Sequence, residues 1–553
     1  MMMNREKLEE AVGINITMIG LDECLDEEEN KTCDGSCRNN LLISALSYMV
    51  NSNKSSLAAP KITLEPECSC KATTSTQLET CQNNPCLNKG KCITVSKNSA
   101  MCSCPLGFDG PRCQKNIISF KENGFSWFPP LEICDINHLE LNFLTLNPSG
   151  MLLYNGPISH PKKLANIVSD FILVDLEEGY PRLFINYGSG TIQVTVKTKK
   201  PLHDGDWHHL DVFWNTEKIR LIVDYCKGAD IVELEDETAS GFDSSSCQSE
   251  KNVPNFREYV NINGPLQIGG LWMDDFDPSE YFWEDKIKNR FFNGCIRDVY
   301  MNSRLIDLGN PAMFRNVSKD CHYMEEMCQK LKENVGCEEH GSCNGNIHQA
   351  ECQCKPGWTG LNCSISTIST SFSEQSYIKY ALSFDPDRFH TEIQLKFRTR
   401  EKFGELFRIS DQNNREYVVL DIRDSVLCFR YNLNSVNLEE TKLMLSEVNV
   451  NDGQWHLVKV TRYGSVGIIK LDDGEGLRYN ETFRFVGHQF LHIDKQEGVF
   501  VGGKAEFTGV RTFEVLSDFR GGCIDDVRLN GKHLPLPPPR QKNIRQHCIA
   551  ANL

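Results

Sequence analysis

Residues 204–210 read Asp-Gly-Asp-Trp-His-His-Leu, and residues 452–457 read Asp-Gly-Gln-Trp-His-Leu. A second match follows each in the same order, Gly-Cys-Ile-Arg-Asp-Val at 294–299 and Gly-Cys-Ile-Asp-Asp-Val at 522–527. Each copy then has a last cysteine at a similar distance, Cys321 after Cys295 and Cys548 after Cys523. Two long segments that repeat their motifs in order indicate one fold used twice.

The local pattern of both copies is that of β-strands. Short runs rich in β-branched and aromatic residues are broken by Gly, Pro and Asp, and they lie at 170–176, 191–196, 219–224, 416–422, 426–431 and 466–471. Many such runs and few helical periods predict antiparallel β-sandwiches whose inward side chains form the core. The predicted fold class is therefore mainly β.

Composition restricts the class of protein. The 553 residues are 40% hydrophobic and 24% charged, which suits several folded domains. A net charge of -16 opposes binding to phosphate backbones, so we expect no nucleic acid partner. Twenty-five cysteines favour disulfides formed in an oxidising, extracellular compartment.

The sequence shows neither a membrane span nor an export signal. It has no apolar run of about 18 residues, and its start leads into a charged segment. We therefore expect a fragment of an ectodomain or an incomplete gene product.

Two compact groups of six cysteines separate the repeated segments. Both groups end in the spacing C-x-C-x8-C, and their members are Cys81, Cys86, Cys92, Cys102, Cys104 and Cys113, then Cys328, Cys337, Cys343, Cys352, Cys354 and Cys363. Each group spans about 35 residues, which is too short to bury a core, so disulfides must hold it together. A zinc site is the alternative, but the uneven gaps and the oxidising context argue against it.

This spacing resembles that of EGF-like modules. The resemblance implies pairing of the first cysteine with the third, the second with the fourth and the fifth with the sixth. The implied bonds are Cys81–Cys92, Cys86–Cys102, Cys104–Cys113, Cys328–Cys343, Cys337–Cys352 and Cys354–Cys363. Calcium-binding members carry acidic residues before the first cysteine, whereas Thr80 and Met327 stand there in this chain. We therefore expect both modules to be plain spacers.

The repeated tryptophan and histidine residues raise the question of catalysis. Trp207, His208 and His209 have their counterparts in Trp455 and His456. No metal-ligating set or nucleophile motif accompanies them, so we expect a structural turn and no enzyme.

The repeated segments resemble laminin G domains, through the Asp-x-x-Trp-His turn, the Gly-Gly before the last strands and the closing Gly-Cys-Ile. The resemblance implies a calcium ion at the rim of the first copy, held by the carboxylate of Asp170 and the main-chain carbonyls of Tyr187 and Asn293. Calcium favours such oxygen ligands, and the alternative is a solvated aspartate at a strand end. In the second copy Glu416 takes the matching place, so a second site is doubtful.

The remaining cysteines allow several pairings. Cys295 with Cys321 and Cys523 with Cys548 close the last loop of each copy, and Cys226 with Cys247 could staple an insertion rich in Asp, Glu and Ser. The pairing of six others stays open: Cys24, Cys33, Cys37, Cys68, Cys70 and Cys134. Because the total is odd and Cys428 sits inside a strand-like run, we expect Cys428 to be a buried free thiol. Sequons for N-glycosylation occur at Asn15, Asn30, Asn53, Asn316, Asn362 and Asn480.

The N-terminal segment differs from the rest. Residues 4–12 read as a charged helix, while 14–19 and 61–64 read as strands, which suggests a small α/β unit that lacks its beginning. The predicted modules are therefore an α/β segment (1–76), an EGF-like module (77–114), a laminin G-like domain (115–324), a second EGF-like module (325–364) and a second laminin G-like domain (365–553).

This order of modules resembles the membrane-proximal ectodomain of invertebrate neural cadherins. Residues 15–18, 22–24, 127–132 and 452–456 also carry the likeness. It implies calcium-dependent homophilic adhesion with another cadherin of the same kind on an opposing cell, at the extracellular side of the plasma membrane. Rigid modules would then act as spacers or offer their rims to partners. The alternative is a secreted matrix or synaptic organiser of the laminin, agrin or neurexin kind that binds glycans or receptors.

Overall fold

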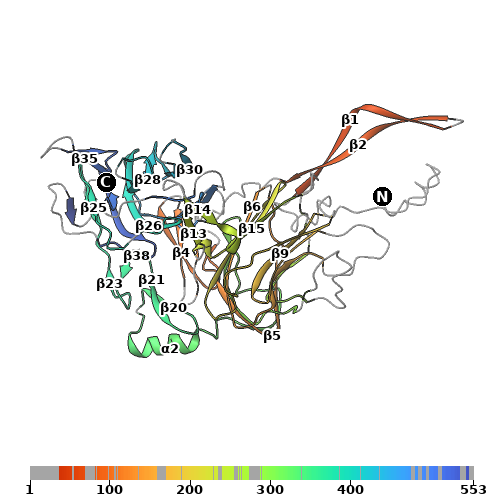
Figure 1. The fold of residues 1–553 in the computed structure, drawn as a ribbon, viewed down its shortest axis with the longest axis horizontal. Helices are drawn as coiled ribbons and strands as arrows, with labels where there is room; N and C mark the ends of the chain where they lie inside the picture. Colours follow the sequence, from red (N-terminus) through yellow and green to blue (C-terminus); the bar gives the residue numbers. More distant parts are fainter. Residues whose placement is uncertain are drawn as a thin grey trace.

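The computed structural model describes most of the chain from Cys81 to Pro535, together with the backbone of two strands before it and one after it (Figure 1). Within that range the description leaves out 82–83, 97–98, 105–107, 109, 135, 158–169, 188–189, 228–229, 234–239, 254–259, 261, 263, 273–286, 288, 338, 385, 412, 435, 437, 475–479, 484–488, 493–496 and 508–512.

The first repeated segment forms a two-layered sandwich, here called the first sandwich. Its strands, in hydrogen-bonded order, are β10 (Thr191–Thr195), β9 (Tyr180–Asn186), β8 (Phe171–Glu177), β7 (Gly150–Asn155), β16 (Leu266–Ile268), β5 (Ile117–Phe128), β17 (Gly294–Met301), β6 (Ile136–Thr145), β11 (His208–Asn215), β12 (Lys218–Val223) and β15 (Gln248–Asn252). Two short strands, β18 (Arg304–Leu305) and β19 (Met313–Ser318), pair with β17 and β5.

Strand β5 connects the two layers. Its first residues pair with β17 and its last residues pair with β16, while Lys121, Glu122 and Asn123 between them are exposed. Glu122 has a positive φ of 52°, so the strand turns at this point. The side chains buried between the layers, such as Phe143 on β6, form one core.

The second repeated segment forms the second sandwich from two separate sheets. One sheet contains β33 (Asn480–Phe483), β32 (Val466–Leu471), β31 (His456–Tyr463), β26 (His390–Thr399), β37 (Gly522–Leu529), β24 (Thr370–Phe372) and β39 (Ile544–Gln546), with β38 (Lys532–His533) beside β37. The other contains β25 (Ile378–Tyr380), β34 (Val499–Val501), β27 (Gly404–Ser410), β28 (Tyr417–Arg423), β29 (Val426–Asn432) and β30 (Thr441–Asn449). Their facing side chains form a second core.

The predicted strands are present in both copies. The runs predicted at 170–176, 191–196 and 219–224 correspond to β8, β10 and β12, and those predicted at 416–422, 426–431 and 466–471 correspond to β28, β29 and β32. Short apolar runs succeed as predictors here because strands such as β8, β28 and β29 are buried on both faces. The prediction of a mainly β fold is confirmed.

Each group of six cysteines forms a small module built on a hairpin. The first cysteine module (81–113) contains β3 (Lys91–Ser96) and β4 (Ser99–Ser103), and the second (328–363) contains β20 (Gly341–Gly345) and β21 (Ala350–Cys354). A helix, α2 (Glu325–Asn334), leads into the second module. The bonded pairs in the structure are Cys81–Cys92, Cys86–Cys102, Cys104–Cys113, Cys328–Cys343, Cys337–Cys352 and Cys354–Cys363. These are the pairs that the EGF-like resemblance implies.

Smaller hairpins complete the described chain: β13 (Asp230–Glu233) with β14 (Ser240–Asp243), β22 (Trp358–Thr359) with β23 (Ile365–Ser366), and β35 (Lys504–Phe507) with β36 (Phe513–Leu516). Near the N-terminus, β1 (Cys37–Ser52) and β2 (Ser55–Cys68) form a long hairpin that extends away from the sandwiches (Figure 1). The predicted strand 61–64 falls inside β2, whereas the predicted helix 4–12 and strand 14–19 lie outside the described residues.

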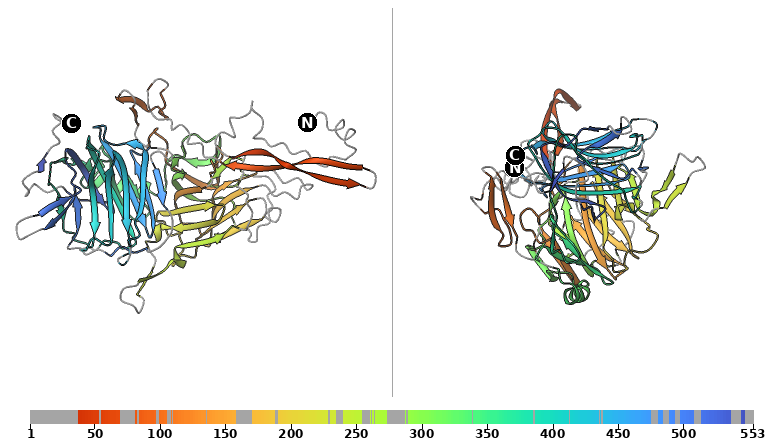
Figure 2. Two further views of the ribbon diagram at one scale, coloured as in Figure 1. Left: turned by 90° about the horizontal axis from the view of Figure 1, so that it is seen from above. Right: turned by 90° about the vertical axis from the view of Figure 1, so that its left-hand side faces the viewer.

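The two sandwiches pack directly against each other (Figure 2). An apolar cluster at their contact joins Phe213, Ile222 and the Cys226–Cys247 disulfide of the first sandwich to Phe389 and Val466 of the second. This contact buries the outer face of β6 and β11, which creates the charged site described below.

Candidate functional site

Two of the predicted calcium ligands, Asp170 and Tyr187, lie at adjacent strand ends of the first sandwich. Asp170 directly precedes β8 and Tyr187 directly follows β9, and the ladder pairs Phe171 with Asn186 between them. Burial, and then the negative charge of Asp170, raises the pKa of the Tyr187 phenol. This corner therefore brings together a carboxylate and a main-chain carbonyl, which are oxygen ligands that calcium prefers.

The third predicted ligand, Asn293, lies elsewhere. Its carbonyl accepts a hydrogen bond from Thr145 Oγ1 at 2.6 Å. Asn293 lies close to Gly150, because the backbone just before Asn293 is 2.9 Å from the position that a Cβ atom on Gly150 would take. Gly150 pairs with Leu176, whereas Asp170 lies at the opposite end of β8. The assignment of Asn293 is therefore wrong, because β17 begins at the other end of the sheet.

In the second sandwich the matching residue, Glu416, has other partners. Its Oε2 accepts a hydrogen bond from the backbone N–H of His492 at 2.7 Å and lies 3.0 Å from His492 Nδ1. The Glu416 side chain is buried. These bonds give Glu416 a structural role that does not require an ion.

The Trp-His motifs form the same closed turn in both sandwiches. In the first, His208 Nε2 lies 3.0 Å from Asp204 and His208 Nδ1 lies 2.8 Å from Asp224. The second sandwich repeats the two contacts at 3.2 and 2.7 Å with His456, Asp452 and Asp472. Burial opposes protonation of His456, but the two carboxylates outweigh it and raise the pKa to about 9. An imidazole held in this way ties the turn to the end of the following hairpin.

A buried group of charged side chains lies between the two sandwiches. His138 and Glu140 on β6 share the outer face of the first sandwich with His209 and Asp211 on β11. Glu140 and Asp211 are direct cross-strand partners, an arrangement that destabilises a sheet unless positive charge lies nearby. His138 Nε2 lies 2.7 Å from Asp211 Oδ1, and His209 Nε2 lies 3.2 Å from Asp211 Oδ2.

The second sandwich supplies further partners to this group. Lys470 Nζ lies 3.3 Å from both carboxylate oxygens of Glu140, and the Tyr463 hydroxyl donates to Asp211 Oδ2 at 3.1 Å. Burial disfavours the ionised form of Glu140, but Lys470 and then His138 lower its pKa. The site therefore links the two sandwiches through opposite charges.

The chemistry of this group also suits a metal ion. One ligand atom from each of His138, Glu140 and Asp211 lies within 4.8 Å of the others, and imidazole with carboxylate is a common ligand set. The ammonium group of Lys470 already neutralises Glu140, however, and it would repel a second cation. We therefore interpret the group as an ion-pair network.

Sequence reasoning missed this network. A signal was present, because polar residues alternate along both strands at 138, 140 and 142 and at 209 and 211. A period of two marks the outer face of a strand, but it does not show what covers that face.

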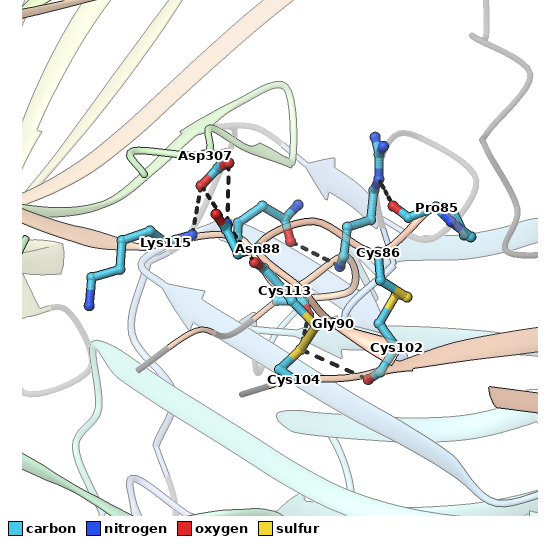
Figure 3. Close-up of a disulfide and its surroundings, with 12 residues drawn as sticks. Pro85, Cys86, Asn88, Gly90, Cys102, Cys104, Cys113, Lys115 and Asp307 are labelled. Atoms are coloured by element: carbon cyan, nitrogen blue, oxygen red, sulfur yellow. Dashed lines mark hydrogen bonds between the residues drawn. A yellow bond between two sulfur atoms is a disulfide. The ribbon is translucent and has the colours of Figure 1, made fainter. Parts of the chain in front are cut away.

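The first cysteine module is hydrogen-bonded to the first sandwich (Figure 3). The backbone N–H of Lys115 donates to Asp307 Oδ1 at 2.7 Å, and Asn88 Nδ2 lies 3.4 Å from both Asp307 oxygens. Asn88 Nδ2 also donates to the carbonyl of Cys113 at 2.9 Å. The end of the module is thereby fixed to the sandwich that follows it.

The second cysteine module contacts both sandwiches. The indole Nε1 of Trp207 donates to the carbonyl of Gly345 at 2.8 Å. On the other side, the backbone N–H of Gly357 donates to Asp526 Oδ2 at 2.9 Å. The Trp207 turn is thus a docking surface as well as a structural turn.

The other cysteines are partly described. Cys295 is bonded to Cys321, and Cys134 and Cys523 are also disulfide-bonded. Cys548 lies outside the described residues, and so do the side chains of Cys24, Cys33, Cys37, Cys68 and Cys70. The ladder of β1 and β2 places the backbone of Cys37 opposite that of Cys68.

One predicted glycosylation residue is sterically unsuitable. The side chain of Asn480 is only 3% exposed, and its Nδ2 donates to the carbonyl of Gly474 at 2.8 Å. A glycan needs this nitrogen at the surface, so the folded protein cannot carry one there. Asn316 is exposed and Asn362 is partly exposed, whereas Asn15, Asn30 and Asn53 lie outside the described residues.

Comparisons with known sequences match most of these modules. The laminin G domain family matches residues 143–304 and 397–532, the EGF-like domain family matches 81–112, and the family described as "DE-cadherin, Ig-like domain" matches 1–61.

The chain is 55% identical to neural-cadherin of Drosophila melanogaster over 97% of its own length and 17% of that protein. It is 49% identical to putative neural-cadherin 2 of the same organism, over 97% of this chain and 30% of that protein. The chain thus spans a minor part of each relative. Among solved structures, the LG1-3 region of the laminin alpha2 chain is 14% identical with a TM-score of 0.28, covering 78% of this chain and 68% of that one.

The family matches thus cover parts of both repeated segments and the first cysteine module. The relatives are cadherins by name, and the matched families are modules of such proteins. The chain is not an enzyme. Within the described residues, no helix is both long enough and apolar enough to cross a membrane.

Proposed function

We propose, from the premise that the chain belongs to the laminin G domain family, that it is an extracellular part of a cadherin-like receptor for cell–cell adhesion. In this role its modules form a rigid body between an adhesive region and the membrane, and their rims are open to protein partners. The receptor adheres to another cadherin of the same kind on an opposing cell, in the presence of calcium.

The observation that carries the spacer role is the continuity of contacts between modules. The first cysteine module is bonded to the first sandwich through Asp307, and the second module is bonded to both sandwiches through Trp207 and Asp526. The sandwiches are joined by an apolar cluster and by the contact of Lys470 with Glu140. A chain of modules without loose junctions transmits force and holds its length better than flexible linkers do.

A cell aggregation assay tests this role. Non-adherent cells would display a cadherin adhesive tip on the full chain, or the same tip on a flexible Gly-Ser linker of equal residue number. The spacer role predicts faster calcium-dependent aggregation with the chain. Equal aggregation with both supports contradicts that role, and aggregation of cells that display the chain alone would place the adhesive surface within it.

We also propose a calcium site at the corner that contains Asp170 and Tyr187. The carboxylate of Asp170 and the carbonyl of Tyr187 are contributed by adjacent strand ends, and water would complete a weak site of few protein ligands. Asn293 takes no part in it. Calcium is the cofactor implied by the family resemblance, and this corner has suitable chemistry for it.

Calorimetric titration of the full chain with calcium tests the site. We expect binding in the range of about 0.1 to 1 mM for the wild type, as for other extracellular modules, and its loss in Asp170→Ala. Glu325→Ala, which removes an exposed carboxylate on α2, is the control and should bind as the wild type does. Undiminished binding by Asp170→Ala would show that the ion is held elsewhere.

A further inference from the structure

An exposed aromatic patch, here called the Trp272 patch, lies at the edge of the first sandwich and consists of Trp272, Met313, Phe314 and Arg315. Trp272 stacks on the buried ring of Phe125 with the ring centres 5.3 Å apart, and the guanidinium of Arg315 lies 4.4 Å from the centre of the Trp272 ring. The exposed fractions are 36% for Trp272, 43% for Met313 and 63% for Phe314. Aromatic residues, methionine and arginine are the residue types that are enriched at protein interfaces.

Three of these residues or their neighbours lie on or beside an edge strand. Within the described chain, β19 forms a ladder with β5 alone, so its other edge is unpaired. Natural sheets usually block an apolar edge with charges or cover it, and a patch of exposed apolar side chains marks an interaction site. The exposed side chains of Met313 and Phe314 therefore indicate a surface that a partner covers.

The cation of the patch lacks a counter-ion. Arg315 Nε and Nη2 donate to the main-chain carbonyl of Asn123 at 3.1 and 3.0 Å, which fixes the guanidinium over the aromatic rings. That carbonyl is neutral, and Arg315 forms no ion pair with a carboxylate of the described residues. Arginine binds carboxylates strongly through its N–H groups, so a partner that suits the patch combines apolar side chains with a carboxylate.

The second sandwich presents that combination on a long rim loop. The strands β9 and β29 end at matching positions of the two sandwiches, Asn186 and Asn432. Residues 187–190 then lead to β10 in the first sandwich, whereas residues 433–440 lead to β30 in the second. The second loop, here called the 433–440 loop, is therefore twice as long as its counterpart.

Side-chain amides hold this loop in one conformation. Asn432 Oδ1 accepts hydrogen bonds from the backbone N–H groups of Asn434 and Glu439, at 3.3 and 3.2 Å. Asn432 Nδ2 donates to the carbonyl of Arg415 at 2.6 Å, and Asn434 Oδ1 accepts from the N–H of Val436 at 2.9 Å. A loop that is ordered before binding loses less entropy when a partner immobilises it.

The loop exposes two aliphatic side chains and a carboxylate. Val436 is 84% exposed and Leu438 is 76% exposed. Glu439 is also exposed, and it forms no ion pair with a cation of the described residues. The 433–440 loop thus offers the apolar groups and the negative charge that suit the Trp272 patch.

The two surfaces cannot meet within one copy of the chain. They belong to different sandwiches, which are joined into one body by the apolar cluster and by the contact of Lys470 with Glu140. Figure 1 shows β5 on the lower side of the first sandwich and β30 on the upper side of the second. The complementary surfaces are therefore free to bind each other only between two copies.

We propose that the Trp272 patch of one copy binds the 433–440 loop of a second copy. The two aliphatic side chains pack on the exposed rings, and Glu439 pairs with Arg315, so apolar contact gives affinity and the ion pair selects the partner. The contact joins two different surfaces, so it does not close on itself and further copies can add at either end. This inference goes beyond the proposed spacer role, because it places a contact between copies within these modules.

Sedimentation equilibrium of the full chain tests this proposal. Secretion from eukaryotic cells keeps any glycan on Asn316, which follows Arg315. We expect the average mass to rise beyond that of a dimer as the concentration increases over the micromolar range, and added salt to weaken the association. A chain that stays monomeric would overturn the proposal, and it would leave unaffected the spacer role, which the aggregation assay tests with a separate adhesive tip.

Charge reversal identifies the two surfaces. Arg315→Glu and Glu439→Arg, each alone, should weaken self-association by about tenfold or more, because each places like charges opposite each other. Mixing the two single variants, or combining both substitutions in one chain, should restore self-association, since opposite charges then meet again. Damage to the fold cannot be repaired in this way.

Two further variants separate the contact from general effects. Lys402→Glu is the matched control, because it makes the same change of net charge at an exposed residue of the second sandwich, and it should associate as the wild type does. Trp272→Ala should weaken self-association by about tenfold or more, while thermal unfolding verifies that this variant is folded.

Three other results would overturn the proposal. Self-association could persist in Arg315→Glu, or the chain with both charge reversals could stay monomeric. Capture of a synthetic peptide of residues 433–440 by a wild-type chain that remains monomeric would assign the patch to a different protein with an apolar and acidic loop.

Discussion

At the scale of the residue, Cys428 explains the odd number of cysteines. It is a free thiol in the middle of β29, fully buried and opposite Asp421 on β28. Burial, and then the negative charge of Asp421, raises its pKa to about 12. Because the thiolate is the reactive form, this cysteine is protected from oxidation and from exchange with neighbouring disulfides.

We predict that the native protein shows no thiol that reacts with Ellman's reagent at pH 8, and that the unfolded protein shows one. Cys428→Ala should abolish the reaction of the unfolded protein and leave all disulfides in place. Cys428→Ser should lower the free energy of unfolding by about 1 to 3 kcal/mol, because it buries a hydroxyl in place of a less polar thiol. A thiol that reacts rapidly in the native wild type would contradict the buried position.

At the scale of the element, the sequence predicts strands well and their spatial partners poorly. The strands β8 and β28 were predictable because a short apolar run bounded by turn residues is a local property of the sequence, and both strands are buried on both faces. Asn293 was misplaced because its position depends on the end of the sheet at which β17 begins, and chain order does not carry that information. Asn480 failed as a glycosylation residue for a similar reason, because its sequon is read without knowledge of burial.

The repeated Trp-His turn is an element whose stability depends on pH. His456 lies between Asp452 and Asp472, and its pKa in the folded protein is raised to about 9 from 6.5. A raised pKa means that the folded state binds the proton more tightly than the unfolded state. The stabilisation is therefore fully present below pH 6.5 and is lost as the pH rises through 9.

We predict that His456→Gln lowers the melting temperature of the protein at pH 6 and that the difference from the wild type shrinks as the pH approaches 9. Thermal unfolding monitored by circular dichroism between pH 6 and 9 measures this. His340→Gln, which changes an imidazole stacked on Trp358, is the control and should give a difference that does not follow this pH course. A constant difference for His456→Gln would show that its role is packing alone.

At the scale of the whole molecule, the two sandwiches behave as one body because a polar face of the first is buried by the second. The charges of Glu140 and Asp211 would favour solvent if the first sandwich stood alone. Lys470 and Tyr463 make their burial tolerable, so the relative orientation of the sandwiches is specified by matched charges as well as by apolar area. Sequence reasoning missed this contact because the partners are more than 250 residues apart along the chain, as for Tyr463 and Asp211.

We predict that Lys470→Met destabilises the contact by about 3 kcal/mol, because it leaves the Glu140 carboxylate buried without its cation. Small-angle X-ray scattering should then show a larger radius of gyration, and proteolysis should cleave between the sandwiches. Lys470→Met combined with Glu140→Gln should recover most of the loss, since neither charge is then left unpaired. Lys459→Met is the control. Lys459 lies on the neighbouring strand β31, and the substitution removes only its exposed ion pair with Asp473, so it should change neither measurement. If the double variant is as open as Lys470→Met alone, the ion pair does not hold the sandwiches together, and the apolar cluster around Phe213 and Phe389 must orient them instead.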